Sequence, residues 1–360
     1  MNFTVTKEIL LSKVQLAAAV VGNKNILPIL GYLLFDVKDN TLDISATNGA
    51  QGVQCSCEVR SDADGKFTVP AKRIVALLNS LPDSADVLVS ADNGKVNIAS
   101  GSSAFTLLSL PAEDFPFVFP DISKRTVRIT SPAHLAKVIS LCKNAVCKDD
   151  GRPLLTGLLL DYTANGLTAC TTDGKRLTIV EQDGTGEDPC QAVIPGIALP
   201  LLSRLSGEVA EIFIDDKNIV VKAENMSVIS KLISGKYPNY RQVVPQTYTH
   251  KFSFDAEELC AAVKQISILT DVEQAVEMRF DNGNVTISVQ ENSVGSGSVT
   301  VTGDCNVTEP LVLKINYRYL LDAMVGCRQT VTIKINSEIN PVCIECDAES
   351  YTILMPIRAR

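Results

Sequence analysis

The sequence predicts an α+β protein made of three tandem, similar domains, each with antiparallel sheets and one layer of helices. Two observations predict this fold. Segments with the same pattern recur about every 120 residues, and each recurrence combines a strand, an amphipathic helix and a hairpin. A chain of 360 residues, 46% of them hydrophobic and 21% charged, is also long enough for two or three separate cores.

Two independent markers define the repeat. The first is an apolar strand that reads FTLLSLP from residue 105, ISKLISG from 229 and YTILMPI from 351, with starts 124 and 122 residues apart. The second is a strand that reaches an aspartate before a turn and an alternating return strand, as a hairpin requires. Its aspartates are Asp36, Asp161 and Asp281, 125 and 120 residues apart. With the Pro-containing seams DFPFVFPD and YPNYRQVVPQ, the markers predict domains at 1–122, 123–245 and 246–360.

Each predicted domain opens with a strand that runs into a helix. The pairs are FTV with KEILLSKVQLAAA, VRIT with AHLAKVISLCKNAV, and KFSF with AEELCAAVKQIS. Ser131 before Pro132, and Asp255 followed by Glu258, are favourable helix starts. The pattern recurs within each domain as FTVPAKRIVALLNSL, AVIPGIALPLLSRLS and LVLKINYRYLLDAMV. The chain therefore contains six copies of a strand, helix and strands.

Cysteine and histidine usage excludes several kinds of site. Eleven scattered cysteines are typical of thiols in a reducing compartment, and MNFTVTKEILLSK has no signal-peptide pattern, so we expect a cytoplasmic protein. Cys343 and Cys346 form a single C-x-x-C, which is too few ligands for a zinc site when the chain has two histidines. Cys55 and Cys57 are interpreted as small, buried strand residues. No nucleophile or nucleotide-binding motif occurs, so we expect no metal, no cofactor and no catalysis.

Charge is distributed unevenly along the chain. The 41 acidic residues outnumber the 33 basic ones, which argues against an ordinary DNA-binding protein. Dispersed lysines on helices suit weak contact with phosphates alone, and six tandem half-units joined head to tail with a second copy would close a ring. The alternative is that these charges are solvated helix faces without a partner. The helical windows contain four acids and nine bases, the bases being Lys7, Lys13, Lys72, Arg73, Lys137, Lys143, Arg204, Lys264 and Arg318.

Six short segments are specific in their order and spacing. They are LPILGYLL (27–34), FTVPAKRI (67–74), LPAEDFP (110–116), TTDGKRL (171–177), SKLISGKYPNYRQVVP (230–245) and MPIR (355–358). In this order they resemble bacterial DNA polymerase III beta subunits, the sliding clamps, and the resemblance runs from residue 3 to 358. It implies a homodimeric ring with sheets outside and helices lining a DNA-sized channel, without catalytic activity. The implied partners are encircled double-stranded DNA, the DNA polymerase III alpha subunit, an ATP-driven clamp loader and other proteins with clamp-binding motifs.

The resemblance also implies a peptide-docking cleft between the second and third domains. Its floor is expected from Leu155, Leu177, Val243 and Leu354, with Met355 as an adaptable side chain at its mouth. Gln242 stands where relatives often have a second arginine. Ala359-Arg360 extends past the usual end of the chain. The matching cleft residues are Leu155, Thr172, Gly174, Lys175, Arg176, Leu177, Pro238, Val243, Val244, Ile353, Leu354, Met355, Pro356, Ile357 and Arg358.

Two further residue sets are implied by position in the family. The DNA-contacting set is Lys24, Lys72, Arg73 and Arg152. The dimer interface is expected to place Phe105 and Leu107 of the first domain against Ile268 and Leu269 of the third domain in the other subunit, which closes the ring by apolar burial.

The stretch TTDGKRL separates repeated architecture from function. Asp173-Gly174 predicts a turn with a counterpart at Asn48-Gly49 in the first domain. Lys175-Arg176-Leu177 has no such counterpart, since Ala50-Gln51-Gly52 follows the first turn, so it predicts a docking rim. Two alternatives are an enzyme that binds phosphate with Asp173, Lys175 and Arg176, and a repeat scaffold that binds only proteins.

Overall fold

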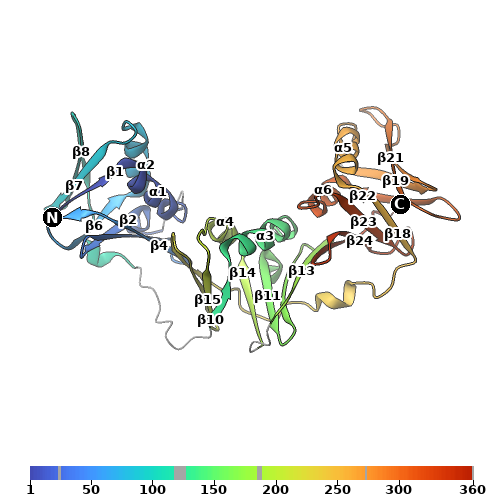
Figure 1. The fold of residues 1–360 in the computed structure, drawn as a ribbon, viewed down its shortest axis with the longest axis horizontal. Helices are drawn as coiled ribbons and strands as arrows, with labels where there is room; N and C mark the ends of the chain where they lie inside the picture. The colour runs from blue at the N-terminus through green and yellow to red at the C-terminus, as the bar shows by residue number, and fades with distance from the viewer. Residues whose placement is uncertain (23–25, 117–126, 185–188, 272–273, 359–360) are drawn as a thin grey trace. The chain divides into compact units, whose positions relative to one another are not determined.

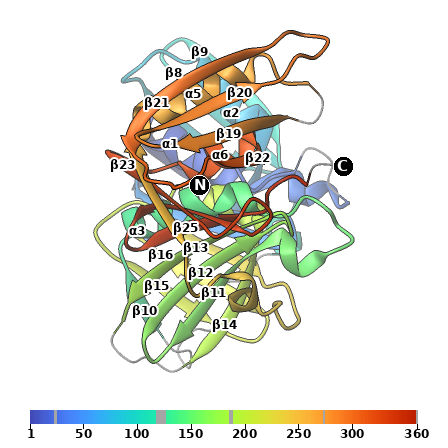
Figure 2. The same ribbon diagram turned by 90° about the vertical axis from the view of Figure 1, so that its right-hand side faces the viewer.

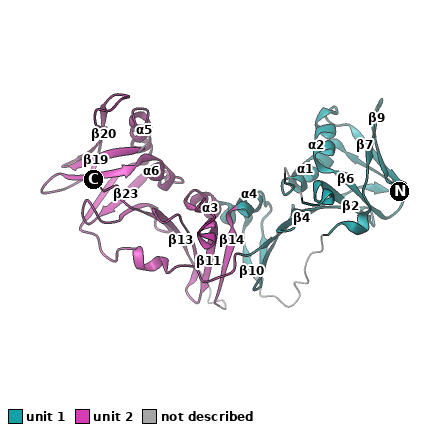
Figure 3. Ribbon diagram, turned by 180° about the vertical axis from the view of Figure 1, so that it is seen from behind, with its two compact units in different colours: residues 1–136, 197–232 teal, residues 137–196, 233–360 magenta. Residues whose placement is uncertain are grey.

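The structure is a computed structural model, and it describes all residues except 23–25, 117–126, 185–188, 272–273 and 359–360 (Figure 1). The chain divides into two compact units (Figure 3). Unit 1 comprises Met1–Ala136 and Ile197–Leu232, and unit 2 comprises Lys137–Gly196 and Ile233–Arg360. This division passes through the middle predicted domain. The domain boundaries expected from the sequence remain a prediction.

Unit 1 begins with a strand and a helix, as the sequence predicts. None of the helices in the described ranges is long and apolar enough to cross a membrane. The elements are β1 (Asn2–Thr6), α1 (Lys7–Ala18), η1 (Pro28–Gly31), β2 (Tyr32–Lys38), β3 (Thr41–Thr47), β4 (Gln51–Glu58), β5 (Arg60–Ser61), β6 (Gly65–Pro70), α2 (Ala71–Ser80), β7 (Asp86–Asp92), β8 (Lys95–Ser100), β9 (Ser103–Leu108), η2 (Ala112–Asp114), β10 (Val127–Thr130), the start of α3 (Pro132–Cys142), α4 (Leu199–Leu202), β15 (Ala210–Ile214), β16 (Asn218–Lys222) and β17 (Ser227–Lys231).

The first segment of unit 2 begins within α3, and its second segment includes the third predicted domain. Its elements are η3 (Lys143–Ala145), η4 (Pro153–Thr156), β11 (Gly157–Thr163), β12 (Gly166–Thr172), β13 (Arg176–Asp183), β14 (Cys190–Pro195), η5 (Gly196–Ala198, which ends in unit 1), η6 (Tyr240–Val243), β18 (His250–Asp255), α5 (Ala256–Ser267), β19 (Ala275–Asp281), β20 (Asn284–Val289), β21 (Gly297–Asp304), β22 (Leu311–Asn316), α6 (Tyr317–Ala323), β23 (Thr330–Ile335), β24 (Val342–Asp347) and β25 (Ser350–Leu354).

Antiparallel sheets dominate both units, which confirms the predicted fold class. Unit 1 holds a five-stranded sheet in the order β5-β1-β7-β8-β9 and an eight-stranded sheet in the order β10-β15-β16-β17-β4-β3-β2-β6. Unit 2 holds a twelve-stranded sheet in the order β14-β11-β12-β13-β25-β24-β23-β18-β21-β20-β19-β22. Figure 2 shows β25 beside β13 in this sheet. The predicted hairpins are β2-β3, β11-β12 and β19-β20.

The apolar marker strands of the three repeats are β9, β17 and β25, and they differ in their strand partners. In two copies the marker strand extends the sheet of the preceding domain: β17 pairs with β4, Ile229 opposite Gly52, and β25 pairs with β13, Ile353 opposite Leu177. The third copy, β9, forms the end of its sheet and has no second strand partner among the described residues. Its Phe105 is 39% exposed. The repeat therefore leaves one edge of β9 without a strand partner in the part of the chain that the structure describes, while its other edge pairs with β8.

Helix starts follow the predicted chemistry. The Ser131 hydroxyl oxygen accepts a hydrogen bond from the His134 N–H at 3.1 Å, and the Asp255 carboxylate accepts one from the Glu258 N–H at 2.8 Å. The fourth predicted helix is shorter than its sequence window. It consists of η5 and the four-residue α4, because Pro200 supplies no N–H to the helix and Gly196 favours a turn.

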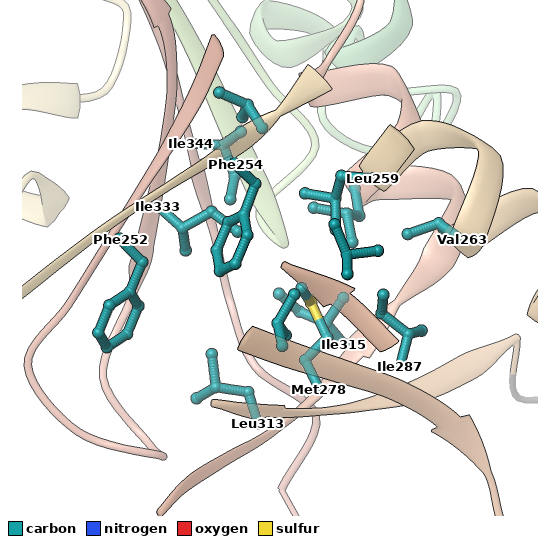
Figure 4. Packing of buried hydrophobic residues seen from close by; sticks show 14 of the residues in the cluster. Phe252, Phe254, Leu259, Val263, Met278, Ile287, Leu313, Ile315, Ile333 and Ile344 are labelled. Atoms are coloured by element: carbon teal, nitrogen blue, oxygen red, sulfur yellow. The ribbon is translucent and has the colours of Figure 1, made fainter. Parts of the chain in front are cut away.

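One hydrophobic core lies in the third domain, between α5, α6 and the surrounding strands (Figure 4). Phe254 and Phe280 pack with ring centroids 6.2 Å apart. Leu259 and Val263, four residues apart on α5, point into the same core, as an amphipathic helix requires. These contacts position β25 and α6, which border the candidate site.

Two expectations about single residues need correction. Lys7 is not part of an exposed basic helix face, because it is 6% exposed and its ammonium lies 2.6 Å from the Asp83 carboxylate. Cys346 is not a free thiol but forms a disulfide with Cys327. Cys343, its C-x-x-C neighbour, is buried in a different apolar cluster.

Candidate functional site

The turn between β12 and β13 is held by its own side chains. Gly174 has a φ of +87°, a conformation that glycine adopts without strain. The Asp173 carboxylate accepts hydrogen bonds from the backbone N–H groups of Lys175 at 2.9 Å and Arg176 at 3.1 Å. The Thr172 hydroxyl donates to the Arg176 carbonyl at 2.6 Å. The predicted turn is confirmed, and it fixes the positions from which the side chains of Lys175 and Arg176 project.

The same turn occurs between β3 and β4 in the first domain. Gly49 has a φ of +88°, and the Asn48 side-chain oxygen accepts from the N–H groups of Ala50 at 3.0 Å and Gln51 at 2.8 Å. The Thr47 hydroxyl donates to the Gln51 carbonyl at 2.6 Å. The two turns therefore share one architecture. Their difference lies in the residue that opens the next strand, Gln51 in one and Arg176 in the other.

Arg176 joins the second domain to the third. Its Nε lies 3.1 Å from Asp173 Oδ2, and its Nη1 lies 2.6 Å from Asp322 Oδ2 on α6. Its Nη2 donates to the Asn144 carbonyl, and its guanidinium carbon lies 4.3 Å from the centroid of the Tyr319 ring. The side chain is 10% exposed. Arg176 is thus a largely buried connector at the edge of the site, and its three guanidinium nitrogens each donate to an acceptor of the chain.

This geometry does not support a phosphate-binding catalytic site at the turn. The guanidinium donors of Arg176 are directed at protein acceptors, and the Asp173 carboxylate is occupied by two backbone N–H groups and Arg176. Lys175 is exposed beside them. Within the described parts of the chain, no three or more His, Cys, Asp or Glu side chains are grouped so that they could hold a metal ion.

The C-terminal segment runs along the same edge. Met355 donates its N–H to the Lys175 carbonyl at 3.0 Å, which continues the pairing of β25 with β13. Further along, the Ile357 N–H donates to the Lys314 carbonyl at 2.7 Å. Met355 is 41% exposed, whereas Pro356 and Ile357 are half-buried. The structure therefore brings Met355 next to the Thr172–Arg176 turn, where the sequence predicts the mouth of the cleft.

The predicted apolar floor is only partly assembled. Leu155 and Leu177 belong to one apolar cluster, together with Val244. Leu354 packs instead into the core of the third domain, because successive residues of β25 point to opposite faces and Ile353 takes the side of Leu177. Val243 is 52% exposed and lies outside the cluster. Leu155, Leu177 and Val244 therefore share one apolar cluster, and their contact with a partner peptide stays a prediction.

A buried carboxylate anchors the segment that carries Val243 and Val244. Asp161 on β11 is 4% exposed, and its oxygens lie 3.1 Å from the Tyr240 hydroxyl, 3.2 Å from Arg241 Nη1 and 3.0 Å from Gln191 Nε2. Burial, followed by the nearby Asp161 charge, raises the pKa of Tyr240, so this hydroxyl stays protonated and donates. The sequence marks Asp161 only as a hairpin residue, although an aspartate within the apolar run LLLDY is a signal of a buried polar contact.

Comparison with known proteins supplies the family. The chain matches the description "DNA polymerase III beta subunit, N-terminal domain" over residues 1–119, the central domain of the same subunit over 130–239 and its C-terminal domain over 241–358. The chain belongs to the DNA polymerase III beta subunit family. The three matches follow one another in the order of the observed repeat, which confirms three tandem domains.

Relatives of the DNA polymerase III beta subunit family match over their full length. The beta sliding clamps of Chlamydia muridarum and Pseudomonas putida are each 28% identical to this chain, over 99% of it and 99% and 100% of their own lengths. The crystal structure of the Pseudomonas aeruginosa DNA polymerase III subunit beta has a TM-score of 0.93 at 25% identity, with 100% of both chains covered. A Pseudomonas aeruginosa sliding clamp bound to griselimycin has a TM-score of 0.93 at 26% identity and the same coverage.

The residues expected to contact DNA have different surroundings. Lys24 lies outside the described residues. Lys72 and Arg73 are exposed in the first turn of α2. Arg152 is half exposed, lies 3.3 Å from the Asp149 carboxylate, and its Nη1 approaches Gly174 so closely that a Cβ there would lie 2.9 Å away. Arg152 therefore stands beside the cleft turn, and its contact with DNA stays a prediction.

The residues expected at the dimer interface are apolar and accessible in this chain. Phe105 is 39% exposed and Leu107 half-buried on the end strand β9. Ile268, directly after α5, is 76% exposed, and Leu269 is partly buried against the core of the third domain. Exposed apolar side chains of this size, on the edge strand of a sheet or at the end of a helix, are typical of an interaction surface. The interface itself stays a prediction.

We expect Met355→Ala to weaken peptide binding about tenfold, because a flexible apolar side chain at the mouth of the cleft is lost. The measurement is fluorescence anisotropy with a peptide that carries a Gln and apolar clamp-binding motif. The matched control is Ile339→Ala, which truncates another exposed apolar residue of unit 2, 65% exposed and outside the cleft. Equal affinity of the two variants would show that Met355 does not contact the peptide.

Proposed function

We propose that this protein is a DNA sliding clamp, a processivity factor that encircles duplex DNA and tethers the replicative polymerase. The observation that carries the proposal is the match of all three domains, in order, to the DNA polymerase III beta subunit. The relatives that match over their full length are named beta sliding clamps. Such a clamp works by holding its partners and not by catalysis, and we expect it in the cytoplasm, where bacterial DNA is replicated.

We infer that partners dock beside the Thr172–Arg176 turn. A peptide with apolar side chains would bury them against Leu155, Leu177 and Val244, and Met355 would adapt to different sequences. In this arrangement Arg176 positions the rim more than it contacts the ligand, since its donors already engage Asp173, Asp322 and Asn144. The expected partners are the DNA polymerase III alpha subunit, a clamp loader and other proteins with the same short motif.

The free edge of the marker strand β9 supports the proposal of a dimer. β17 pairs with β4, and β25 with β13, so by the same repeat β9 would pair with β21 of the third domain. β21 meets β18 only at Gly303 and Asp304, which leaves the edge of its first six residues without a strand partner in the described chain. Pairing of β9 from one copy with β21 of the other would cover both of these edges. Two such contacts, one in each direction, close a head-to-tail dimer.

DNA would be held loosely. An acidic chain with a few exposed bases such as Lys72 and Arg73 suits contact with phosphates alone, which permits sliding without sequence preference. Retention would come from the closed ring and not from affinity.

The test is loading onto nicked circular DNA with a clamp loader, followed by linearisation. We expect the protein to stay on the circle at high salt and to leave once the DNA is cut, because a ring is linked to its DNA by topology. A conventional binder would be lost to salt and would not respond to the cut. Protein that never becomes linked to the circle would favour the alternative of a scaffold that binds only proteins.

We expect the double variant Ile268→Ala, Leu269→Ala to be monomeric, because it removes the apolar contact at the end of α5. Light scattering at micromolar concentration measures the mass. The control is Ile197→Ala, which truncates a residue of comparable exposure, 72%, outside the predicted interface. If the double variant stays dimeric, the interface lies elsewhere.

A further inference from the structure

The disulfide between Cys327 and Cys346 fastens α6 to the sheet. Cys327 lies four residues after the end of α6, and Cys346 lies on β24 at an irregularity in its pairing with β25. The two Cα atoms are 4.7 Å apart, within the range that a disulfide spans, and the cysteines are 19 residues apart in sequence. Both are partly exposed.

We propose that Cys327 and Cys346 are a modification site for a small thiol–disulfide couple, and that the bridge controls how firmly α6 is held. Through α6, the site would regulate the cleft, a consequence that rests on the function proposed above. The compartment expected from the sequence is reducing, where the bridge would form only under oxidation. Oxidation would then change how firmly α6 is held beside the proposed partner-binding cleft.

α6 connects the cysteines to the cleft. Its Asp322 accepts hydrogen bonds from Arg176 Nη1 at 2.6 Å and from Asn144 Nδ2 at 3.0 Å, and its Tyr319 ring lies under the Arg176 guanidinium. A small cavity is lined by both Asp322 and Cys346. Loosening of α6 would therefore reach Arg176 through direct contacts.

Cys346 is open to a small reactant. It lines a cavity of about 710 Å³ whose wall also includes the basic residues Lys137 and Arg328 and the acidic Asp347. The ammonium of Lys137 lies 3.6 Å from the Asp347 carboxylate and 3.4 Å from the Glu349 carboxylate, which offset its charge. Arg328 adds a further positive charge to this wall, which suits a thiol that carries carboxylates, such as a thiol tripeptide.

The exchange balances without another oxidant or reductant. A small thiolate attacks one sulfur of the bridge, the S–S bond breaks, and the other cysteine leaves as a thiolate that takes a proton from water. A second small thiol attacks the mixed disulfide, which frees the first cysteine and forms the small disulfide. Oxidation is the reverse, so two cysteine thiols are oxidised as one small disulfide is reduced to two thiols.

Four other cysteines of the chain are poor competitors for this reaction. Burial raises the pKa of Cys55 and Cys142 to about 12, and that of Cys57 and Cys343 to about 11, so these thiols stay protonated at neutral pH. A mild small disulfide would therefore leave them unchanged.

The experiment incubates the full chain in buffers with different ratios of reduced to oxidised glutathione. Peptide mapping by mass spectrometry follows the bridge, and hydrogen exchange follows the amides of α6. We expect the bridge to form reversibly, and the α6 amides to exchange about tenfold faster once it is reduced. Cys346→Ser should exchange at the fast rate in every buffer, and Cys57→Ser, which changes a half-buried cysteine elsewhere, should behave as the unmodified protein.

Two results would overturn the proposal: no Cys327–Cys346 bridge in the most oxidising buffer, or a bridge that leaves α6 exchange unchanged. Anisotropy with the clamp-binding peptide is measured in the same buffers, and we expect weaker binding after reduction. A peptide that binds in neither state would contradict the proposed cleft. It would leave the cysteine site supported if the bridge and exchange respond, because neither readout involves a peptide.

Discussion

Arg176→Ala is expected to lower the free energy of unfolding of the chain by about 3 kcal/mol and to abolish measurable peptide binding. The substitution leaves Asp173, 17% exposed, and Asp322, 35% exposed, without their shared cation, and removes the packing on Tyr319. Removing one partner of a largely buried ion pair costs several kcal/mol, because the remaining charges stay desolvated. Urea titration measures stability, and anisotropy measures peptide affinity.

Two variants separate the causes of this effect. Arg176→Lys keeps the charge but cannot reach Asp173, Asp322 and the Asn144 carbonyl together, so we expect an intermediate loss of stability. Lys175→Ala changes the exposed neighbour on the same turn and should change stability by less than about 0.5 kcal/mol. An Arg176→Ala protein as stable as the unmodified chain would contradict the connector role of this side chain.

Asp161→Ala is expected to destabilise the chain by about 2 kcal/mol, because the buried Tyr240 hydroxyl loses its acceptor, whereas Arg241, 56% exposed, and Gln191 can turn to water. The repeat provides a matched control in Asp36, the equivalent residue of the first domain. Its carboxylate is 29% exposed and pairs with Lys66, which is 60% exposed, so Asp36→Ala should cost less than about 1 kcal/mol. Equal urea midpoints for both variants would contradict the anchoring of Val243 and Val244 by Asp161.

The sequence predicts the local elements of this protein well because short-range chemistry determines them. Each hairpin at Asp36, Asp161 and Asp281 has its turn residues within a few positions, and the helix starts at Ser131 and Asp255 depend on an N–H three residues later. The turn at Asp173-Gly174 and its copy at Asn48-Gly49 are predictable for the same reason. The repeat strengthens each of these predictions, because the same hairpin pattern occurs in all three domains.

Long-range contacts of the candidate site are not predictable in this way. Arg176 and Asp322 are 146 residues apart, and nothing near either residue indicates the pairing. The family resemblance identifies Arg176 as a cleft residue, but its burial depends on how α6 packs. The role of Leu354 is missed because the face of a strand depends on its register, and a shift of one residue exchanges the two faces. The partner of Cys346 is missed because the C-x-x-C pattern draws attention to Cys343.

The pairings of β4 with β17 and of β13 with β25 join neighbouring domains, so a single domain cut from the chain loses strand partners. A fragment of residues 123–245 would lose both partners and expose the backbone of β17 and β13 at once. Such bare edges recruit strands from other molecules, so we expect the isolated fragment to aggregate where the whole chain does not. A bare edge of this repeat can therefore be covered in two ways, by the next domain of the same chain or, as proposed for β9 and β21, by a second copy, and a lone middle domain has neither.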